Sequence, residues 1–284
     1  MRAIEVLVEE LIDYAGLYPP AGLDMRSAVR NYLNYRHGKY GYALGRFVVD
    51  LNHIGSLREA AGDSIDTLSL SVVASPASDW DKLAELADAG IRIEVVEVKP
   101  NLSGDVASLN KRIPAGVRAY FEVPMNNEAT GFVEGIAGAG TRAKLRMGGV
   151  IAEAFPSTSS VARMLKELAR RGIAFKATAG LHHAIRSRHP FTYDVDSQSG
   201  VMHGFVNLFC AAALIHFRGD VDDAESLLKD EDTTAWEVND TAIRWKSFGV
   251  STSQVREVRR KFMNSFGCCS FEEPLQGLEA LGWL

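Results

Sequence analysis

The chain has 284 residues, of which 46% are hydrophobic and 24% charged, with a formal net charge of −5. This composition is typical of a soluble globular protein with a large core, and the length suits one α/β barrel of roughly 250 residues. The acidic balance argues against a partner nucleic acid, and no apolar run approaches the ~20 residues that cross a membrane.

Short runs rich in β-branched and apolar residues recur along the chain and predict strands. Helical patterns lie between most of them, for example residues 24–38, with Asp24 as N-cap and Gly38 as stop, and residues 156–172. Strands that alternate with helices of this length favour βαβ units and a parallel sheet. Eight runs predict a single (β/α)8 TIM barrel, with a doubly wound open sheet as the main alternative. The predicted strands are residues 10–16, 45–51, 67–75, 91–98, 118–124, 142–149, 174–183 and 264–271.

About eighty residues separate the seventh and eighth predicted strands, far more than an ordinary loop. They begin with a strongly apolar helix in "VMHGFVNLFCAAALIHF", residues 201–217. We predict that residues 218–262 form an insertion within one barrel domain that spans residues 1–284. Its first half is helical in pattern, and "AWEVNDTAIRW" (235–245) is typical of a small hairpin.

Polar residues near the ends of the predicted strands are candidates for the active site, because a barrel keeps its chemistry at the C-terminal ends of its strands. Residues two apart share a face of a strand, so Lys144 and Arg146 point the same way, as do Lys176 and Thr178. Strands six and seven then place two lysines and an arginine together inside the barrel. The polar residues at strand ends are Asp50, Glu97, Glu122, Lys144, Arg146, Lys176 and Thr178.

Two buried lysines in one place allow two interpretations. Burial and a neighbouring cation both favour the neutral amine, and a lysine with a lowered pKa attacks carbonyl compounds to form a Schiff base. Alternatively, the lysines form an ion-pair layer with Glu97 and Glu122 inside the barrel.

The block "AKLRMGGVIAEAFPSTSSVARMLKELARRGIAFKATAGLHH" resembles strands six and seven of the deoxyribose-phosphate aldolase group of class I aldolases. The resemblance implies that Lys144, with Gly148 four residues on, carries the Schiff base. It also implies that Lys176, in a Phe-Lys-x-x-Ala-Gly context, perturbs Lys144. The "FEVP" run is similar to a glutamate-bearing strand of the group, and "FGCCSF" is similar to its phosphate-binding turn, mapped to Gly267 and Ser270.

Three residues depart from the pattern of that group. Arg146 stands where the group has a small hydroxyl residue, and His182 and His183 replace a glycine region that helps to hold phosphate. Glu97 is the nearest candidate, by strand position, for the group's acid/base aspartate.

Several other residues are candidates at the same end of the barrel. His182 continues the parity of Lys176 and Thr178 and is a candidate acid/base group, with a loop-capping role as the alternative. Tyr14 is more consistent with packing than with substrate contact, in a loop that also offers Asp13 and Tyr18. The candidates for holding a substrate anion are Arg146, Gly148, Gly149, Thr178, Gly180, His183, Gly267 and Ser270.

The leading hypothesis is a Schiff-base lyase, aldolase-like, that acts on a small anionic carbonyl compound with no cofactor and no metal. Lys144 would be the nucleophile and Lys176 the group that lowers its pKa, with Glu122, Glu97 or His182 moving protons. One alternative is a metal-dependent hydrolase or lyase that uses His182, His183 and His203 with a glutamate. Another is a barrel that binds a small anion without turnover.

The remaining expectations concern location and assembly. Three cysteines, Cys210, Cys268 and Cys269, show no zinc-site spacing, and the N-terminus has no cleavable signal pattern, which together favour the cytoplasm. The apolar outer helices are compatible with a homodimer.

Overall fold

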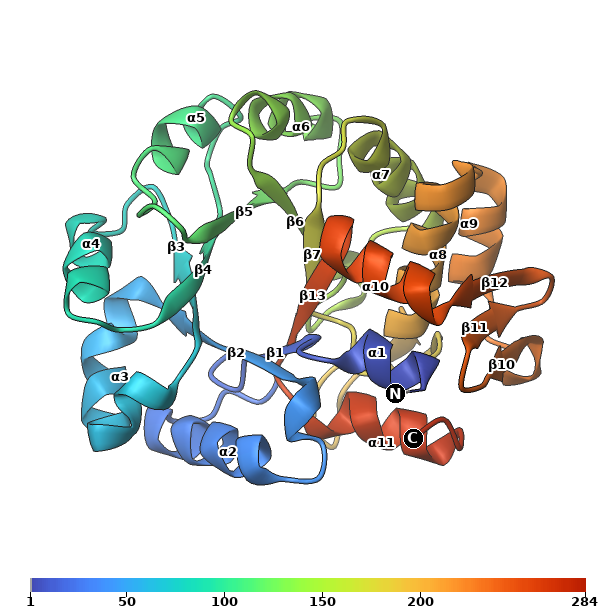
Figure 1. Ribbon diagram of the computed structural model, residues 1–284, viewed down its shortest axis with the longest axis horizontal. Coiled ribbons are helices and arrows are strands. Elements are labelled where there is room, and N and C mark those ends of the chain that lie inside the picture. Colours follow the sequence, from blue (N-terminus) through green and yellow to red (C-terminus); the bar gives the residue numbers. More distant parts are fainter. Residues whose placement is uncertain (1) are drawn as a thin grey trace.

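Eight parallel strands close into a barrel in the computed structural model, which describes residues 2–284 apart from the side chain of Ala87. Figure 1 shows the strands as a central ring with the helices outside it. The neighbour order around the ring is β1, β13, β7, β6, β5, β4, β3, β2, and β2 closes onto β1. The prediction of a (β/α)8 barrel is therefore confirmed.

The barrel strands fall within or close to the predicted runs, and they are shorter at several ends. The seventh predicted strand ends at Thr178, so His182 and His183 lie in the loop that follows it. The strands are β1 (Ile12–Tyr14), β2 (Leu44–Asp50), β3 (Leu70–Ala74), β4 (Ile93–Val98), β5 (Arg118–Val123), β6 (Arg142–Arg146), β7 (Phe175–Thr178) and β13 (Met263–Cys268).

Local sequence signals explain where the outer helices begin. Asp24 caps α2 by accepting a hydrogen bond from the Ser27 amide, and Ser157 caps α7 in the same way through Ser160. The helices are α1 (Ala3–Val8), α2 (Met25–His37), α3 (Ile54–Ala61), α4 (Asp81–Asp88), α5 (Asp105–Asn110), α6 (Ala129–Gly138), α7 (Thr158–Arg170), α8 (Phe205–Arg218), α9 (Val221–Lys229), α10 (Thr252–Lys261) and α11 (Glu272–Ala280). None of the helices in residues 2–284 combines the length and apolarity needed to cross a membrane.

The long interval between β7 and β13 contains two small sheets. The predicted hairpin forms from β10 (Trp236–Val238) and β11 (Ala242–Trp245), and β12 (Phe248–Ser251) adds a third strand. A second hairpin, β8 (Ser187–Pro190) with β9 (Ser199–Met202), was not predicted. The helix α9 packs against α7 and α8 in the outer ring (Figure 1). That residues 218–262 are an insertion within one domain stays a prediction.

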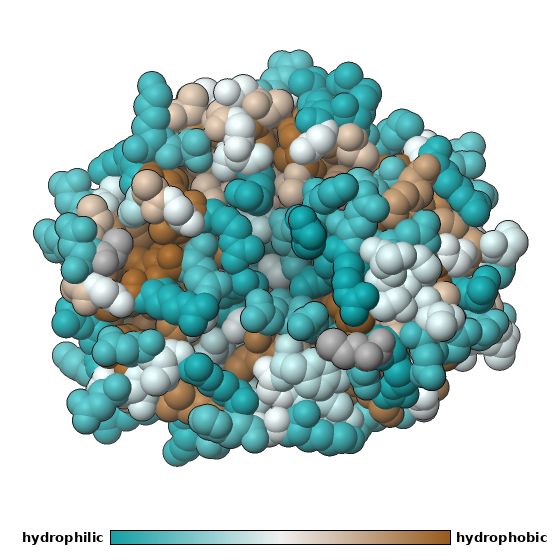
Figure 2. Space-filling view, viewed as in Figure 1, coloured by the Kyte–Doolittle hydropathy of each residue, from teal (hydrophilic) through white to brown (hydrophobic). Residues whose placement is uncertain are grey.

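Alternation along the strands separates an apolar shell from a polar interior. Phe121, Leu145 and Phe175 belong to the apolar core between strands and helices. Their neighbours Glu122, Lys144 and Lys176 point the other way, into the barrel. Barrel interiors are usually filled by bulky branched residues, so this polar interior is a distinctive feature. Figure 2, in the same view, shows hydrophilic residues around the central opening.

Strands β1 and β2 approach closely at Gly45. A Cβ atom at this position would meet a side-chain oxygen of Asp13 and lie 3.1 Å from the backbone oxygen of Ile12. The missing side chain thus lets the backbone amide of Arg46 donate a hydrogen bond to Asp13 at 2.9 Å.

We expect Gly45→Ala to lower the free energy of unfolding by about 1–3 kcal/mol, because the added methyl group overpacks the contact between the two strands. The matched control is Gly55→Ala, where no heavy atom lies within 4 Å of the new Cβ. Denaturant unfolding of both variants measures the effect. Equal free energies of unfolding for Gly45→Ala and the wild type would contradict the prediction, because they would show that β1 and β2 can move apart at no cost in stability.

Candidate active site

A row of alternating charges crosses the interior of the barrel. Consecutive members lie within ion-pair distance, and β1, β4, β5, β6 and β7 supply them. We call this set the charge row: Asp13, Lys176, Glu97, Lys144, Glu122 and Arg146.

Lys176 forms the sealed end of the charge row. Its side chain has no exposed surface, and its Nζ lies 2.6 Å from Asp13 and 2.5 Å from Glu97. Burial alone would lower the pKa of Lys176, but the two carboxylates outweigh it and raise that pKa above its usual range. The charge of Lys176 is therefore compensated by two carboxylates.

Glu97 joins the two lysines. Its Oε1 accepts hydrogen bonds from Lys176 and from Ser71 at 2.7 Å, and its Oε2 lies 2.9 Å from the Nζ of Lys144. Burial would raise the pKa of Glu97, but Lys176 and Lys144 hold it well below its usual range. Glu97 thus remains a carboxylate and fixes both ammonium groups.

The other end of the charge row reaches the surface. The Nζ of Lys144 lies 3.2 Å from Glu122, and the Nε of Arg146 lies 3.3 Å from the same carboxylate. The exposed fraction of the side chain rises from 6% at Lys144 to 12% at Glu122 and 48% at Arg146. Lys144 is therefore the lysine of the row that lies next to open space.

Further groups hold the sealed end in place. Ser265 donates a hydrogen bond to Asp13 at 2.8 Å, and the Arg46 guanidinium lies 3.7 Å from the same carboxylate. Arg46 in turn pairs with Glu94 at 2.9 Å. Burial would raise the pKa of Asp13, but Lys176 and Arg46 lower it. Every charge at this end therefore has a partner.

A cavity of about 370 Å³ opens at the C-terminal ends of the barrel strands, above the charge row. It brings together nine of the thirteen predicted site residues: Glu97, Glu122, Lys144, Arg146, Gly149, Thr178, Gly180, His182 and Gly267.

Four predicted site residues lie outside the wall of this cavity. Lys176 is sealed beneath it, and Gly148 packs against Gly180, whose Cα would lie 2.9 Å from a Cβ at Gly148. His183 lines a smaller cavity of about 130 Å³, and its ring stacks on His189 with the centroids 3.3 Å apart. Ser270 accepts a hydrogen bond from the Glu273 amide at the start of α11.

Three further residues considered in the sequence analysis, Asp50, Tyr14 and His203, make contacts that stabilise the fold. Asp50 accepts a hydrogen bond from the Asn52 amide, and Tyr14 is buried and packs edge-on against Tyr35 and Phe47. His203 is buried, and its Nε2 donates to the carbonyl oxygen of Pro156 at 2.8 Å. Burial lowers the pKa of His203 to about 4.

Several roles of residues in the charge row and in the cavity wall were not predicted from the sequence. The charge-row role of Asp13 was not predicted, although its position between buried Ile12 and Tyr14 is a signal of an inward-facing residue. The Tyr18 hydroxyl lines the cavity, is buried, and has no hydrogen-bond partner in residues 2–284. Lys99, which is exposed, and Cys269 also line it.

The metal-dependent alternative lacks a ligand cluster. In the part of the chain that the structure describes, no three His, Cys, Asp or Glu residues lie in a group that could hold a metal ion. Glu97 and Glu122 face lysines, and the Nδ1 of His182 contacts Glu273.

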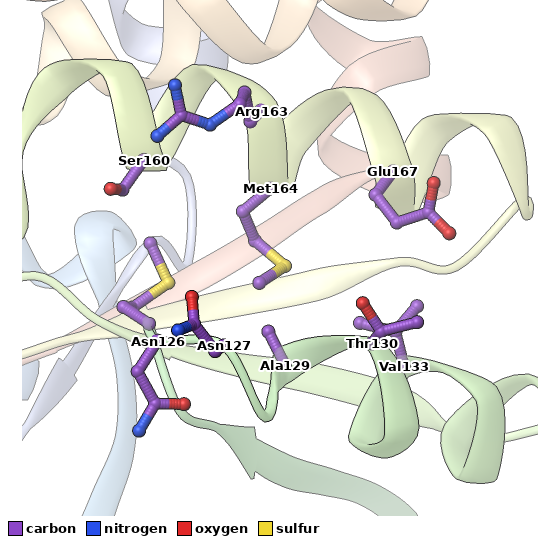
Figure 3. A pocket seen from close by; sticks show the side chains of 10 residues that line it. Asn126, Asn127, Ala129, Thr130, Val133, Ser160, Arg163, Met164 and Glu167 are labelled. Carbon is purple, nitrogen blue, oxygen red and sulfur yellow. The ribbon is translucent and has the colours of Figure 1, made fainter.

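Another cavity, of about 300 Å³, lies outside the barrel between α6 and α7 (Figure 3). Side chains of both helices line it, and Met164 extends from α7 toward Ala129 and Thr130 of α6. It contains none of the predicted site residues, so the cavity above the charge row is the candidate active site.

Comparisons with known proteins add no information about activity. No family model matches the sequence, and no curated protein matches it. Among solved structures, FabK from Thermotoga maritima is similar with a TM-score of 0.38 and 14% identity, over 98% of this chain and 81% of that chain. A similarity this distant carries no inference about activity.

We expect Lys176→Met to lower the free energy of unfolding by about 3–5 kcal/mol, because it leaves Asp13 and Glu97 buried without their shared cation. The control is Lys82→Met, which removes a surface pair with Asp79 in which both side chains are more than half exposed. It is expected to change stability by less than about 1 kcal/mol.

The deficit of Lys176→Met depends on pH. In the wild type the pKa values of Asp13 and Glu97 are lowered, so their contribution to stability is present above the ordinary carboxyl pKa and is lost as pH falls. The deficit should therefore shrink as pH falls below about 4. Denaturant unfolding across this range measures it, and a deficit that does not change with pH would contradict the assignment.

Proposed function

We propose that this barrel is a Schiff-base-forming lyase, related in mechanism to the deoxyribose-phosphate aldolase group, that acts on a small anionic carbonyl compound. The observation that carries the proposal is the position of Lys144. Its amine lies at the floor of the mouth cavity between two carboxylates, at 2.9 and 3.2 Å.

Lys144, and not Lys176, is the nucleophile in this proposal. The two lysines are register partners on β6 and β7. Lys144 lines the cavity, whereas Lys176 is sealed and pairs with two carboxylates. Lys176 then acts as a positioning residue that keeps Glu97 ionised and in place.

Glu122 is the proton acceptor that suits Lys144. Burial would raise the pKa of Glu122, but Lys144 and then Arg146 hold it below its usual range. When Lys144 loses its proton, the largest lowering influence disappears and the carboxylate becomes more basic. The free amine attacks the carbonyl carbon, a C–N bond forms, and the carbonyl oxygen leaves as water.

The cavity suits a small anion. Its volume of about 370 Å³ is at the lower end of the range for small-molecule sites. Arg146 and Lys99 supply positive charge at the rim, and the Tyr18 hydroxyl offers a hydrogen bond to an oxygen atom of the substrate. Gly180 and Gly267 leave room for close approach of the ligand.

Borohydride trapping tests the proposal directly. The protein is incubated separately with glyoxylate, pyruvate and glyceraldehyde 3-phosphate, reduced with borohydride, and mapped by peptide mass spectrometry. We expect a reduced adduct on Lys144, because it lies at the cavity floor, and none on the exposed rim lysine Lys99. Lys144→Met should remove the adduct, and Glu122→Gln should slow its formation by about 10²–10⁴-fold.

The same experiment separates catalysis from a static ion-pair layer. Binding of one of these compounds, shown by calorimetry, without any adduct on Lys144 would overturn the proposal and favour a barrel that only binds anions. Equal labelling of Lys99 and Lys144 would also contradict it.

A further inference from the structure

A second group of reactive side chains, separate from the charge row, lies beside the mouth cavity. The Sγ of Cys269 lies 3.8 Å from the Nε2 of His182, and the Nδ1 of His182 lies 2.5 Å from a carboxylate oxygen of Glu273. The imidazole therefore has a thiol at one nitrogen and a carboxylate at the other. We call Cys269, His182 and Glu273 the thiol group.

Three separate elements bring the thiol group together. Cys269 directly follows β13, where Ser265 and Gly267 face the interior, so it continues the inward parity and lines the mouth cavity. His182 lies in the loop after β7 and lines both cavities. Glu273 is the second residue of α11 and lines the smaller cavity.

The adjacent cysteine, Cys268, lies outside the wall of the mouth cavity. Cys268 belongs to the apolar core between strands and helices, in alternation with Gly267 and Cys269. Cys210 is fully buried in α8, and burial raises its pKa above the usual range. Of the three free thiols, Cys269 alone is found in the wall of the mouth cavity.

A nucleophile, a base that contacts it and a carboxylate that orients the base form the arrangement that activates serine and cysteine nucleophiles. We propose that Cys269 is a thiol nucleophile that accepts an acyl group from a small ester or thioester, with His182 as its base and Glu273 as the positioning residue. This activity goes beyond the Schiff-base chemistry at Lys144 and does not depend on it.

The step balances within the thiol group and its ligand. The thiol proton passes to the Nε2 of His182, and the thiolate sulfur forms a bond with the acyl carbon. The bond from that carbon to the leaving oxygen or sulfur then breaks, and the leaving group takes the proton from His182. The product is an acyl thioester on Cys269, and no oxidant or reductant is needed.

The carboxylate of Glu273 favours the protonated imidazole, which is the state of His182 after it has taken the thiol proton. Burial would lower the pKa of His182, but the neighbouring thiols of Cys268 and Cys269 and the carboxylate of Glu273 raise it above its usual range. Burial would raise the pKa of Glu273, and His182 lowers it. The Tyr193 hydroxyl lies 3.9 Å from the Sγ of Cys269, a position from which it can approach a negative oxygen on the acyl carbon.

We choose an acyl compound as the ligand because His182 can return its proton to the group that leaves an acyl carbon. An alkoxide leaves a carbonyl carbon readily only when it is protonated, and His182 holds the proton that the thiol released; a thiolate leaves more easily and takes up the same proton afterwards. The cavity of about 370 Å³ limits the acyl group to a small one.

Acetylation by p-nitrophenyl acetate tests the inference. Release of p-nitrophenolate is followed by absorbance, and the acetyl group is located by peptide mass spectrometry. We expect a burst with acetyl on Cys269, absence of the burst in Cys269→Ser, and a slower burst by about 10²–10⁴-fold in His182→Asn. Cys210→Ser should keep the burst, since Cys210 is buried in α8, away from the mouth cavity.

The role of Glu273 is tested by the acetylation rates of two variants. Glu273→Gln should slow acetylation, and Glu273→Asp should restore part of the rate, because only a carboxylate orients the charged imidazole. If Glu273 had only a structural role, the rate of acetylation would not depend on whether residue 273 carries a charge. Thermal melting of each variant confirms that it is folded.

Two results would overturn the inference: acetyl spread equally over Cys269, Cys268 and Cys210, or unchanged acetylation in folded His182→Asn. Borohydride trapping on Lys144 in Cys269→Ser keeps the two activities distinguishable. An adduct there, without acetylation of the wild type, would contradict the thiol inference and leave the Schiff-base proposal standing.

Discussion

Charges buried inside the barrel must be compensated, and this requirement governs how its strands fit together. An ammonium or carboxylate in a dry interior costs several kcal/mol unless opposite charges and hydrogen bonds surround it. Each buried member of the charge row meets that requirement, and Glu97 does so for two lysines at once. This requirement couples β1, β4, β6 and β7, which are far apart in the sequence.

The charge row also determines which groups are available for chemistry. Its sealed end, around Asp13 and Lys176, is saturated with partners and has no exposed surface. Its open end places Lys144 and Glu122 under a cavity whose wall continues to the thiol group. The paired charges inside the barrel therefore lie directly beneath the reactive side chains at its mouth. This arrangement is expected when the barrel strands hold the residues of a site in position.

The sequence was sufficient for the barrel, because strand-like runs alternate with helical ones and cap signals such as Asp24 act locally. Parity along the strands was sufficient to place Lys144, Arg146 and Thr178 on one cavity. One of the two partners of Lys176, Asp13, was missed because it lies 163 positions away. Only barrel closure, in which β13 pairs with both β1 and β7, brings the two residues together. Glu273 was missed because a glutamate in the first turn of a helix is common on surfaces, and nothing local links it to His182.

A crystal structure of the protein cooled shortly after exposure to the carbonyl compound that traps best is the most direct test of the account. A Schiff base on Lys144 would give continuous density from the Nζ of Lys144 to the former carbonyl carbon, with Lys176 still between Asp13 and Glu97. A ligand bound in the cavity with its carbonyl intact, or an adduct on a lysine outside the cavity, would contradict it.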